Sequence, residues 1–207
     1  MARPKIVPIV PVALDADGIC LSQTKASSGS LTLNGVLAGT TLDFSRLIAV
    51  ASSANIAARV FTITGTDANG RAITDTVTGV NNNSVNSTKY FSTVTDVSVD
   101  ASFSANNVTV GTTAALATKM FPLNHYDEVA AQVTVELASG TATWSVQETF
   151  SEPSGTSASE VWITPTAHSG KSATLSAPLD LHARACRLIT SAISTPTISL
   201  NINQSGC

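Results

Sequence analysis

Two stretches of alternating apolar and Thr residues, separated by the tetrapeptide Asp67-Ala-Asn-Gly70, constrain the fold of this chain most strongly. Before the tetrapeptide, Phe61 and Ile63 alternate with threonines, and the run after it repeats the pattern. Period-two alternation predicts half-buried strands. Asn-Gly between two such runs is a strong hairpin signal, because both residues tolerate positive φ. The sequence therefore predicts a β-hairpin over residues 59–78.

The composition extends this β character to the whole chain. The 207 residues include 28 Thr and 26 Ser, and only 12% of the residues are charged. Thr is β-branched and favours strands, whereas Ser favours turns and loops. Leu, Lys and Glu, which build amphipathic helices, are comparatively scarce. We therefore expect an all-β protein.

Other short apolar or alternating runs are separated by turn residues at the spacing expected of a sandwich or barrel. They predict strands at residues 31–33, 47–50, 90–94, 97–99, 107–110, 129–137, 144–150, 161–163, 187–190 and 197–202. We expect Ser139-Gly140 to join two of these strands in a hairpin, and Ser194-Thr-Pro196 to form a final hairpin turn. Residues 81–87 are expected to be a polar loop or arm, and residues 151–159 a loop rich in Ser, Gly and Pro.

These patterns suggest a chain of four parts. Residues 1–18 are expected to be an extended N-terminal arm, because three prolines interrupt the first apolar stretch. Residues 19–113 and 129–207 each predict a β-sandwich unit of the jelly-roll or Ig-like kind. Residues 114–128 predict a linker, either irregular or holding a short helix. One continuous jelly roll with long loops is the alternative to two sandwiches.

Charge and hydropathy exclude two classes of partner. The net charge is −3 and no Lys/Arg cluster is present, so we expect no direct contact with nucleic acid. No apolar run is long enough to cross a bilayer, and the proline-interrupted start does not fit a secretory leader. Cys20, Cys186 and Cys207 are widely spaced and odd in number. This pattern favours free thiols in a reducing cytoplasm over a disulfide or zinc framework.

The polar residues give no catalytic constellation. His125, His168 and His182 are scattered, and no nucleophile elbow, metalloprotease motif or phosphate-binding loop is present. Glu136 and Glu148 lie on two strands that we expect to pair, and we interpret them as exposed residues of a solvated face rather than an acid–base pair. We therefore expect no catalytic, cofactor-binding or metal-binding residues, no cofactor, and no enzymatic activity.

Three aromatic residues leave one alternative open. Trp144, Trp162 and Phe150 could line a carbohydrate-binding face, although the alternation around them favours core packing. The short acidic segments beginning at Asp15 and Asp67 lack the twelfth-position Glu of a calcium loop, so turn chemistry explains them better.

Several motifs together resemble a recurrent pattern in structural proteins of tailed bacteriophages. They are the hairpin Phe61–Gly79, with Thr-Gly-Thr-Asp before its turn and Thr-Val-Thr-Gly at its end, then Ser87-Thr-Lys-Tyr-Phe-Ser-Thr-Val94 and the closing Val108-Thr-Val-Gly-Thr112. Residues 12–19, 31–35 and 187–191 also resemble parts of these proteins. Residues 81–86 and the terminal Cys207 depart from the pattern.

The resemblance implies a non-enzymatic virion component, assembled in many copies in the host bacterial cytoplasm. Within that class we expect a capsid decoration or cement protein that bridges neighbouring capsid subunits. Its expected partners are the major capsid protein and further copies of itself, as a dimer, trimer or ring. A neck, collar or tail component, with neck or tail proteins as partners, is the alternative. A carbohydrate-binding or adhesion module is the alternative from another class.

Overall fold

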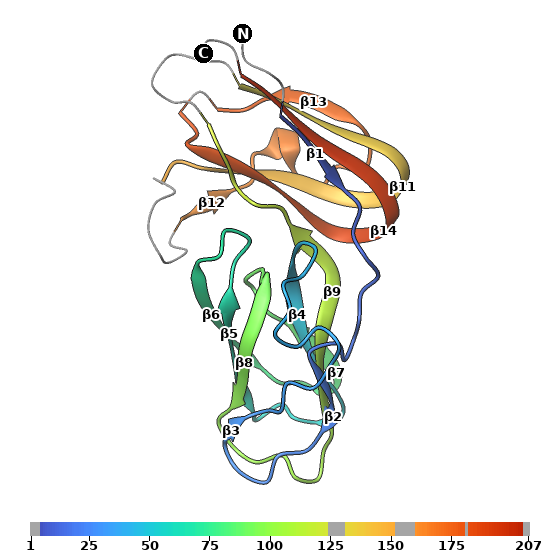
Figure 1. Cartoon of the computed structure of the whole chain (residues 1–207), viewed down its shortest axis with the longest axis vertical. Helices are drawn as coiled ribbons and strands as arrows, with labels where there is room; N and C mark the ends of the chain where they lie inside the picture. The colour runs from blue at the N-terminus through green and yellow to red at the C-terminus, as the bar shows by residue number, and fades with distance from the viewer. Residues whose placement is uncertain (1–4, 124–130, 152–159, 181, 205–207) are drawn as a thin grey trace. The chain divides into compact units, whose positions relative to one another are not determined.

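The computed structural model describes residues 5–123, 131–151, 160–180 and 182–204 (Figure 1). In chain order its elements are β1 (Lys5–Ile9), β2 (Cys20–Gln23), β3 (Gly29–Ser30), β4 (Ser45–Asn55), β5 (Val60–Thr66), β6 (Ala72–Thr78), β7 (Asn81–Asn86), β8 (Thr93–Val99), β9 (Val108–Ala117), β10 (Phe121–Pro122), β11 (Ala131–Thr149), β12 (Trp162–Ile163), the 3-10 turn η1 (Thr166–His168), β13 (Leu175–Pro178) and β14 (Ala185–Gln204). The expected all-β sandwich fold is confirmed. The choice between jelly-roll and Ig-like stays a prediction.

The described residues form two compact units. Residues 14–116 make the N-terminal unit, and the described residues of 5–13, 117–151 and 160–204 make the C-terminal unit. The expected arm, residues 1–18, is therefore divided between the two units. The expected linker, residues 114–128, contains the end of β9 and all of β10, while its residues 124–128 lie outside the described part. In the part of the chain that the structure describes, we find no helix with the length and apolarity needed to cross a membrane.

The N-terminal unit contains two antiparallel layers. In one layer β4 lies between β9 and β7, and β2 pairs with β9; the other layer has the order β3-β8-β5-β6. Alternating residues of both layers point inward, because successive side chains of a strand face opposite sides. The core consists of buried apolar side chains that include Ile48, Val50, Phe61, Ile63, Val97, Val99, Val108 and Val110.

The hairpin predicted over residues 59–78 is confirmed. Strands β5 and β6 pair in continuous register from Val60–Thr78 to Thr66–Ala72. Within the turn only Gly70 has positive φ, at 78°, whereas Asn69 does not. The Gly70 N–H donates to the Asp67 carbonyl over 3.0 Å. The turn is thus a three-residue loop with a bulge-type Gly, and of the two residues that tolerate positive φ only Gly70 adopts it.

Two other local predictions for this unit are wrong. Residues 81–86, expected to be a polar loop, form strand β7, which pairs with β4. Their Asn side chains face solvent, while Val85 packs against the core and the backbone supplies the pairing. A strand with one inward apolar residue gives a weak alternation signal. Residues 31–33 are not a strand, although Leu31 is buried. The two strands expected at 90–94 and 97–99 are largely one strand, β8.

The C-terminal unit is built on one long antiparallel ribbon. Strands β11 and β14, of 19 and 20 residues, pair with each other from Ala131–Gln204 to Thr149–Ala185. Both hairpins predicted in this region are therefore wrong. Register shifts occur around Ser139, where Gly140 has a φ of 73°. Such bulges bend a strand, so Ser139-Gly140 bends the ribbon instead of reversing the chain. Figure 1 shows the curvature of both strands.

Short strands widen the ribbon along its two halves. Strand β13 pairs with residues 132–135 of β11, and β12 pairs with residues 148–149 at the other end. Strand β10 pairs with the beginning of β14. The core of the C-terminal unit includes the buried side chains of Val133, Val135, Trp144, Val146, Leu188, Ile198 and Leu200.

Strand β1 lies on the remaining edge of β14. Residues 5–9 pair with residues 202–198 in unbroken antiparallel register, so the two ends of the chain meet in one sheet (Figure 1). Ile9 is fully buried, and Val7 is half-buried. The sequence analysis expected an extended arm here. The residues are extended, and they complete the sheet of the C-terminal unit.

Candidate assembly surface

A buried polar cluster lies in the core of the C-terminal unit. Glu148 of β11 lies opposite Cys186 of β14, and η1 brings His168 to Glu148. The His168 Nδ1 atom is 3.5 Å from Glu148 Oε1, and each of these side chains is 2% exposed. The Asp180 N–H donates to Glu148 Oε2 over 3.2 Å. Side chains of these types could in principle act as a nucleophile and a base, so their protonation and access decide what they can do.

Burial dominates the titration of this cluster. It raises the pKa of Glu148, an effect that the hydrogen bond from Asp180 partly offsets. Burial also lowers the pKa of His168, with Lys171 contributing in the same direction. It raises the pKa of Cys186 to about 12, with the Glu148 carboxylate as a second cause. At neutral pH the thiol therefore stays protonated, and with all three groups enclosed the cluster is part of the core.

The two glutamates considered in the sequence analysis are not brought together as expected. Glu136 and Glu148 lie on the same strand, β11, rather than on two paired strands. Glu136 is exposed as expected, whereas the expectation that Glu148 faces solvent is wrong. Glu148 lies an even number of residues after Trp144 and Val146, so strict alternation would have placed all three side chains on the core face.

The aromatic residues proposed for a carbohydrate-binding face separate in the structure. Trp144 is 1% exposed, which confirms core packing for this residue. Trp162 is half-buried, and the Arg187 guanidinium lies 4.2 Å from its ring centroid. Arg187 is held there by its Nε, which donates to Gln147 Oε1 over 2.9 Å. Phe150 is 42% exposed. The guanidinium thus covers one face of the Trp162 ring, where a sugar would otherwise stack.

The remaining candidate residues have structural roles or lie outside the described part. His125 lies among residues 124–130, outside it, and His182 is exposed beside Asp180. The Asp67 carboxylate accepts hydrogen bonds from the Asn69 and Arg71 backbones and forms an ion pair with Arg71. This arrangement confirms turn chemistry at that position. Among the described residues, no group of three or more His, Cys, Asp or Glu side chains is placed to hold a metal ion.

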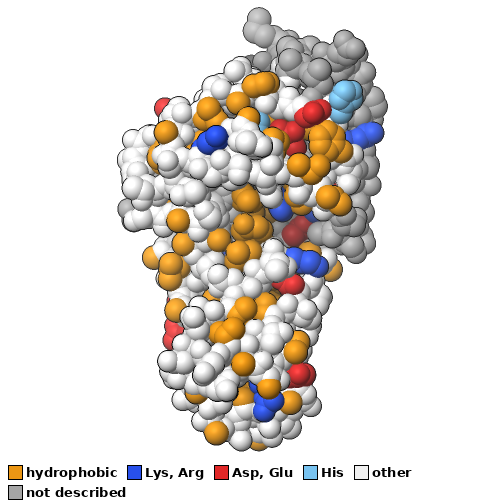
Figure 2. Space-filling view, turned by 180° about the vertical axis from the view of Figure 1, so that it is seen from behind, with side chains coloured by type: hydrophobic (Ala, Val, Ile, Leu, Met, Phe, Trp, Pro, Cys, Tyr) orange, Lys and Arg blue, Asp and Glu red, His pale blue; other side chains and the backbone are white. Residues whose placement is uncertain are grey.

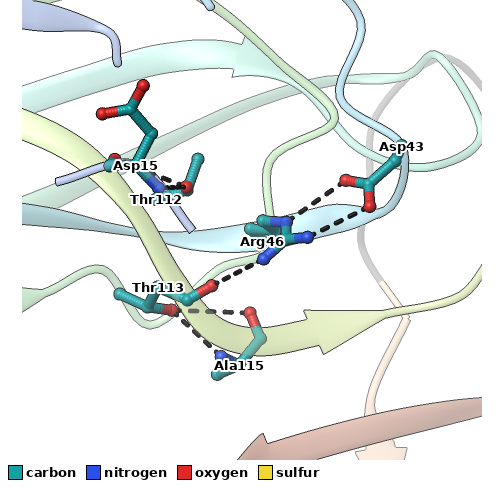
Figure 3. A network of polar contacts seen from close by, with 6 residues as sticks. All are labelled: Asp15, Asp43, Arg46, Thr112, Thr113 and Ala115. Carbon is teal, nitrogen blue, oxygen red and sulfur yellow. Dashed lines mark hydrogen bonds and ion pairs between the residues drawn. The ribbon is translucent and has the colours of Figure 1, made fainter. Parts of the chain in front are cut away.

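The N-terminal segment is fixed to the N-terminal unit at Asp15 (Figure 3). The Asp15 N–H donates to Thr112 Oγ1 over 3.0 Å, and the Thr112 N–H donates back to the Asp15 carbonyl over 2.8 Å. Gly111 allows this contact, because a Cβ atom there would collide with the backbone of Asp15 and Ala16. The sequence analysis named this Gly only as part of the closing Val-Thr-Val-Gly-Thr motif and did not anticipate its role.

A buried ion pair stabilises the same part of the unit. Arg46, which is 1% exposed, donates from Nε and Nη2 to the two carboxylate oxygens of Asp43, over 3.2 and 3.0 Å. Its Nη1 donates to the Thr113 carbonyl over 3.1 Å, next to the residue that holds Asp15 (Figure 3). A two-pronged geometry of this kind gives Arg–carboxylate pairs their strength and direction. The strand that holds Asp15 is therefore itself held by Arg46.

Between β1 and Asp15 the chain exposes a row of apolar side chains. Val10, Val12 and Leu14 are 64%, 60% and 54% exposed, and Ile6 on β1 is 63% exposed. We call residues 10–14 the tether, since the C-terminal unit holds the chain before it and Asp15 fixes the chain after it. A row of exposed apolar side chains is a candidate contact surface for a partner.

The outer face of the C-terminal ribbon is polar and has few charges. Thr134 lies between Ser176 and Asn201 in adjacent strands, and its hydroxyl is 2.8 Å from that of Ser176. Figure 2 shows one face of the molecule, on which charged groups are few and scattered. Repulsion between copies of such a surface is weak.

Comparison with protein-family models gives no match, and comparison with curated proteins gives no significant match.

Proposed function

We propose that this chain is a non-enzymatic structural protein of a tailed-phage virion. Within the virion it acts as a decoration or cement protein on the outside of the head, where it bridges neighbouring capsid subunits. The observation that carries the proposal is the tether, whose exposed apolar side chains lie between two fixed points of the chain. The motifs that resemble phage structural proteins are a second, independent support.

Covering the exposed apolar surface of the tether lowers the free energy of the assembled state. Burial of apolar surface contributes about 25 cal/mol per Å², so covering three half-exposed aliphatic side chains against a neighbour favours association. The many copies on a particle multiply a modest contribution per subunit. The weakly charged, hydroxyl-rich outer face of the ribbon allows such copies to pack closely.

Location on the particle tests this function. The chain, carrying a short epitope tag, is produced together with the structural genes that neighbour its own gene, and the particles are purified and labelled with antibody-coated gold. We expect many labels on the outer surface of the head. Labels confined to the neck or tail would support the alternative virion role instead, and particles without the protein would overturn a virion role.

Point substitutions then test the tether. The Val10→Ser, Val12→Ser double variant should keep its fold and bind less to heads that lack the protein, as measured by co-sedimentation. Val36→Ser is the matched control, because Val36 is 79% exposed and is not one of the tether residues. Substitution is preferable to deletion of the arm, since deletion would also remove β1. Equal binding of the double variant and the control would exclude the tether as the attachment surface.

A further inference from the structure

Strand β1 is joined to the rest of its sheet only through backbone pairing and a few side chains. Its five residues pair with residues 198–202 of β14. Ile9 is its one fully buried side chain, and the Lys5 ammonium lies 4.8 Å from the centroid of the Phe121 ring. Backbone pairing along a sheet edge, with one side chain in a socket, is the way in which separate peptide strands are recognised by proteins.

The chain on either side of the tether is held independently. Asp15 and Thr112 fix the start of the N-terminal unit through two hydrogen bonds, and this contact does not involve β1. The tether contains Pro11, which has no N–H to donate and favours an extended backbone. Five extended residues span at most about 17 Å. Strand β1 can therefore leave its place on β14 without disturbing the anchor at Asp15.

We propose that β1 exchanges between copies, so that residues 5–9 of one chain occupy the edge of β14 in a second copy. The occupant is a second copy because the complementary sequence, register and socket for Ile9 are those already seen within one chain. In the closed form β1 pairs with β14 of its own chain, and in the exchanged form it pairs with β14 of the other copy. Both forms then contain the same strand pairing. The two forms differ in the path of the tether, and a higher concentration of chains favours the exchanged form.

The exposed tether residues favour the exchanged form. In a closed chain Val10, Val12 and Leu14 remain in contact with water. In an exchanged pair the tether of each chain passes from one copy to the next, where these side chains meet the neighbouring copy. The inference concerns contacts between identical chains and goes beyond the proposed attachment to a capsid. It is tested with the purified protein alone, so its failure is distinguishable from failure of the proposed function.

Disulfide trapping between two different chains tests the exchange. Ile6 and Asn201 are direct partners on the outer face of the sheet, and such cross-strand neighbours lie within the range that a disulfide can bridge. One version of the full chain carries Ile6→Cys and a second, with a longer tag, carries Asn201→Cys. Both carry Cys207→Ser. Cys20 and Cys186 are retained, because burial raises the pKa of each thiol to about 12 and keeps it unreactive.

The matched control moves the second Cys along the same row. Ser176 lies in line with Thr134, Asn201 and Ile6, but two strands farther from β1 than Asn201, and it is exposed. The Ile6→Cys chain is mixed with either the Asn201→Cys chain or the Ser176→Cys chain, incubated in mild denaturant, returned to buffer and oxidised. Non-reducing electrophoresis then separates heterodimers by size.

We expect severalfold more covalent heterodimer from the Asn201→Cys mixture than from the Ser176→Cys mixture. The Ile6→Cys, Asn201→Cys double variant of one chain reports whether the two positions can form the bond and whether the substituted protein folds. If this variant closes its internal disulfide while the two mixtures give equal heterodimer, β1 does not exchange and the proposal is overturned. If it forms none although circular dichroism shows it folded, the pairing of β1 with β14 is itself wrong, and the proposal fails with it.

Discussion

The two units differ in where their strands find partners and in how their buried polar atoms are satisfied. In the N-terminal unit β5 and β6 are neighbours in sequence, and the buried Arg46 guanidinium donates hydrogen bonds to Asp43 and Thr113. In the C-terminal unit β11 pairs with a strand far along the chain. There the indole nitrogen of Trp144 and both ring nitrogens of His168 have no hydrogen-bond partner among the described residues, whereas in the described part of the N-terminal unit Ser45 Oγ is the one such atom. A buried polar atom without a partner costs about 1–3 kcal/mol, so we expect the C-terminal unit to unfold first.

Both tryptophans of the chain, Trp144 and Trp162, lie in the C-terminal unit. Tryptophan fluorescence therefore reports on that unit, whereas far-ultraviolet circular dichroism reports on the strands of both. This asymmetry lets each unit be followed separately in one protein.

The largest expected effect comes from truncating a core side chain in one unit. Phe61→Ala removes a fully buried ring from the N-terminal unit and should lower its stability by about 3–5 kcal/mol. In urea, the transition seen by circular dichroism should move while the fluorescence transition stays in place. Leu188→Ala, at a fully buried position of the C-terminal unit, should move the fluorescence transition together with the part of the circular dichroism signal that this unit contributes, and leave the rest of that signal in place. If both probes move equally with either variant, the units unfold as one and the comparison fails.

A slightly smaller effect is expected from the buried ion pair. Arg46→Met removes the guanidinium that donates to the Asp43 carboxylate and the Thr113 carbonyl, which should cost about 3 kcal/mol. Arg187→Met in the C-terminal unit is the control. It removes a guanidinium that lies on a half-buried ring, and it should cost about 1 kcal/mol. Denaturant midpoints by circular dichroism for Arg46→Met and by fluorescence for Arg187→Met give the two values. Equal losses would show that the two units depend similarly on their charged groups.

The glycines that shape the two units should give intermediate effects. Gly70 ends the β5–β6 turn with a φ of 78°, and Gly140 lies at the bend of the ribbon with a φ of 73°. Replacement by Ala should cost about 1–2 kcal/mol at each site, because a Cβ atom disfavours this backbone region. Asn tolerates it better, so Gly70→Asn and Gly140→Asn should recover part of the loss in thermal unfolding. Identical losses of thermal stability with Ala and Asn would mean that lack of space for a side chain, rather than positive φ, makes Gly necessary at these positions.

The smallest effect expected is a pH dependence confined to the C-terminal unit. The pKa of His168 lies below its ordinary value of 6.5, so the unfolded chain binds a proton first and stability falls as pH drops below 6.5. The pKa of Glu148 is raised above 4.5, so its contribution is lost as pH rises through the folded pKa. Lys171, Asp180 and Cys186 are the other titratable groups that act on this pair.

Fluorescence midpoints in urea between pH 4 and pH 8 measure this dependence. His168→Gln should remove part of the loss on acidification, and Glu148→Gln should reduce the decline as pH rises above 4.5. The transition of the N-terminal unit serves as the internal control. An unchanged slope in His168→Gln would show that the histidine is not the group that titrates.

Local pairing was predictable from the sequence, and long-range pairing was not. The β5–β6 hairpin follows from alternation on both sides of one turn, because each residue's partner lies a few positions away. At Ser139-Gly140 the same signs of a turn mark a bend, because the partner strand β14 is available elsewhere in the chain. Turn residues show that the backbone can change direction there. They do not specify whether it reverses.

The candidate surface and the buried cluster differ in the same way. The proline-interrupted character of residues 1–18 was readable, and it indicated an extended segment. Its pairing with residues 198–202 depends on an edge formed by the last strand, which no local pattern indicates. For Glu148 the alternation was informative, but a general preference for exposed glutamate outweighed it.

The pairing of β1 with β14 has a consequence for synthesis. Residues 5–9 leave the ribosome well before residues 198–202. At a synthesis rate of about 5–20 residues per second, roughly ten to forty seconds pass between the synthesis of β1 and that of its partner residues in β14. Ribosomes that follow one another on a message thus hold several chains whose first strand is made but not yet placed. The earliest opportunity for one chain to complete another therefore arises during translation, when the first strand of a growing chain meets a chain whose β14 has already been made.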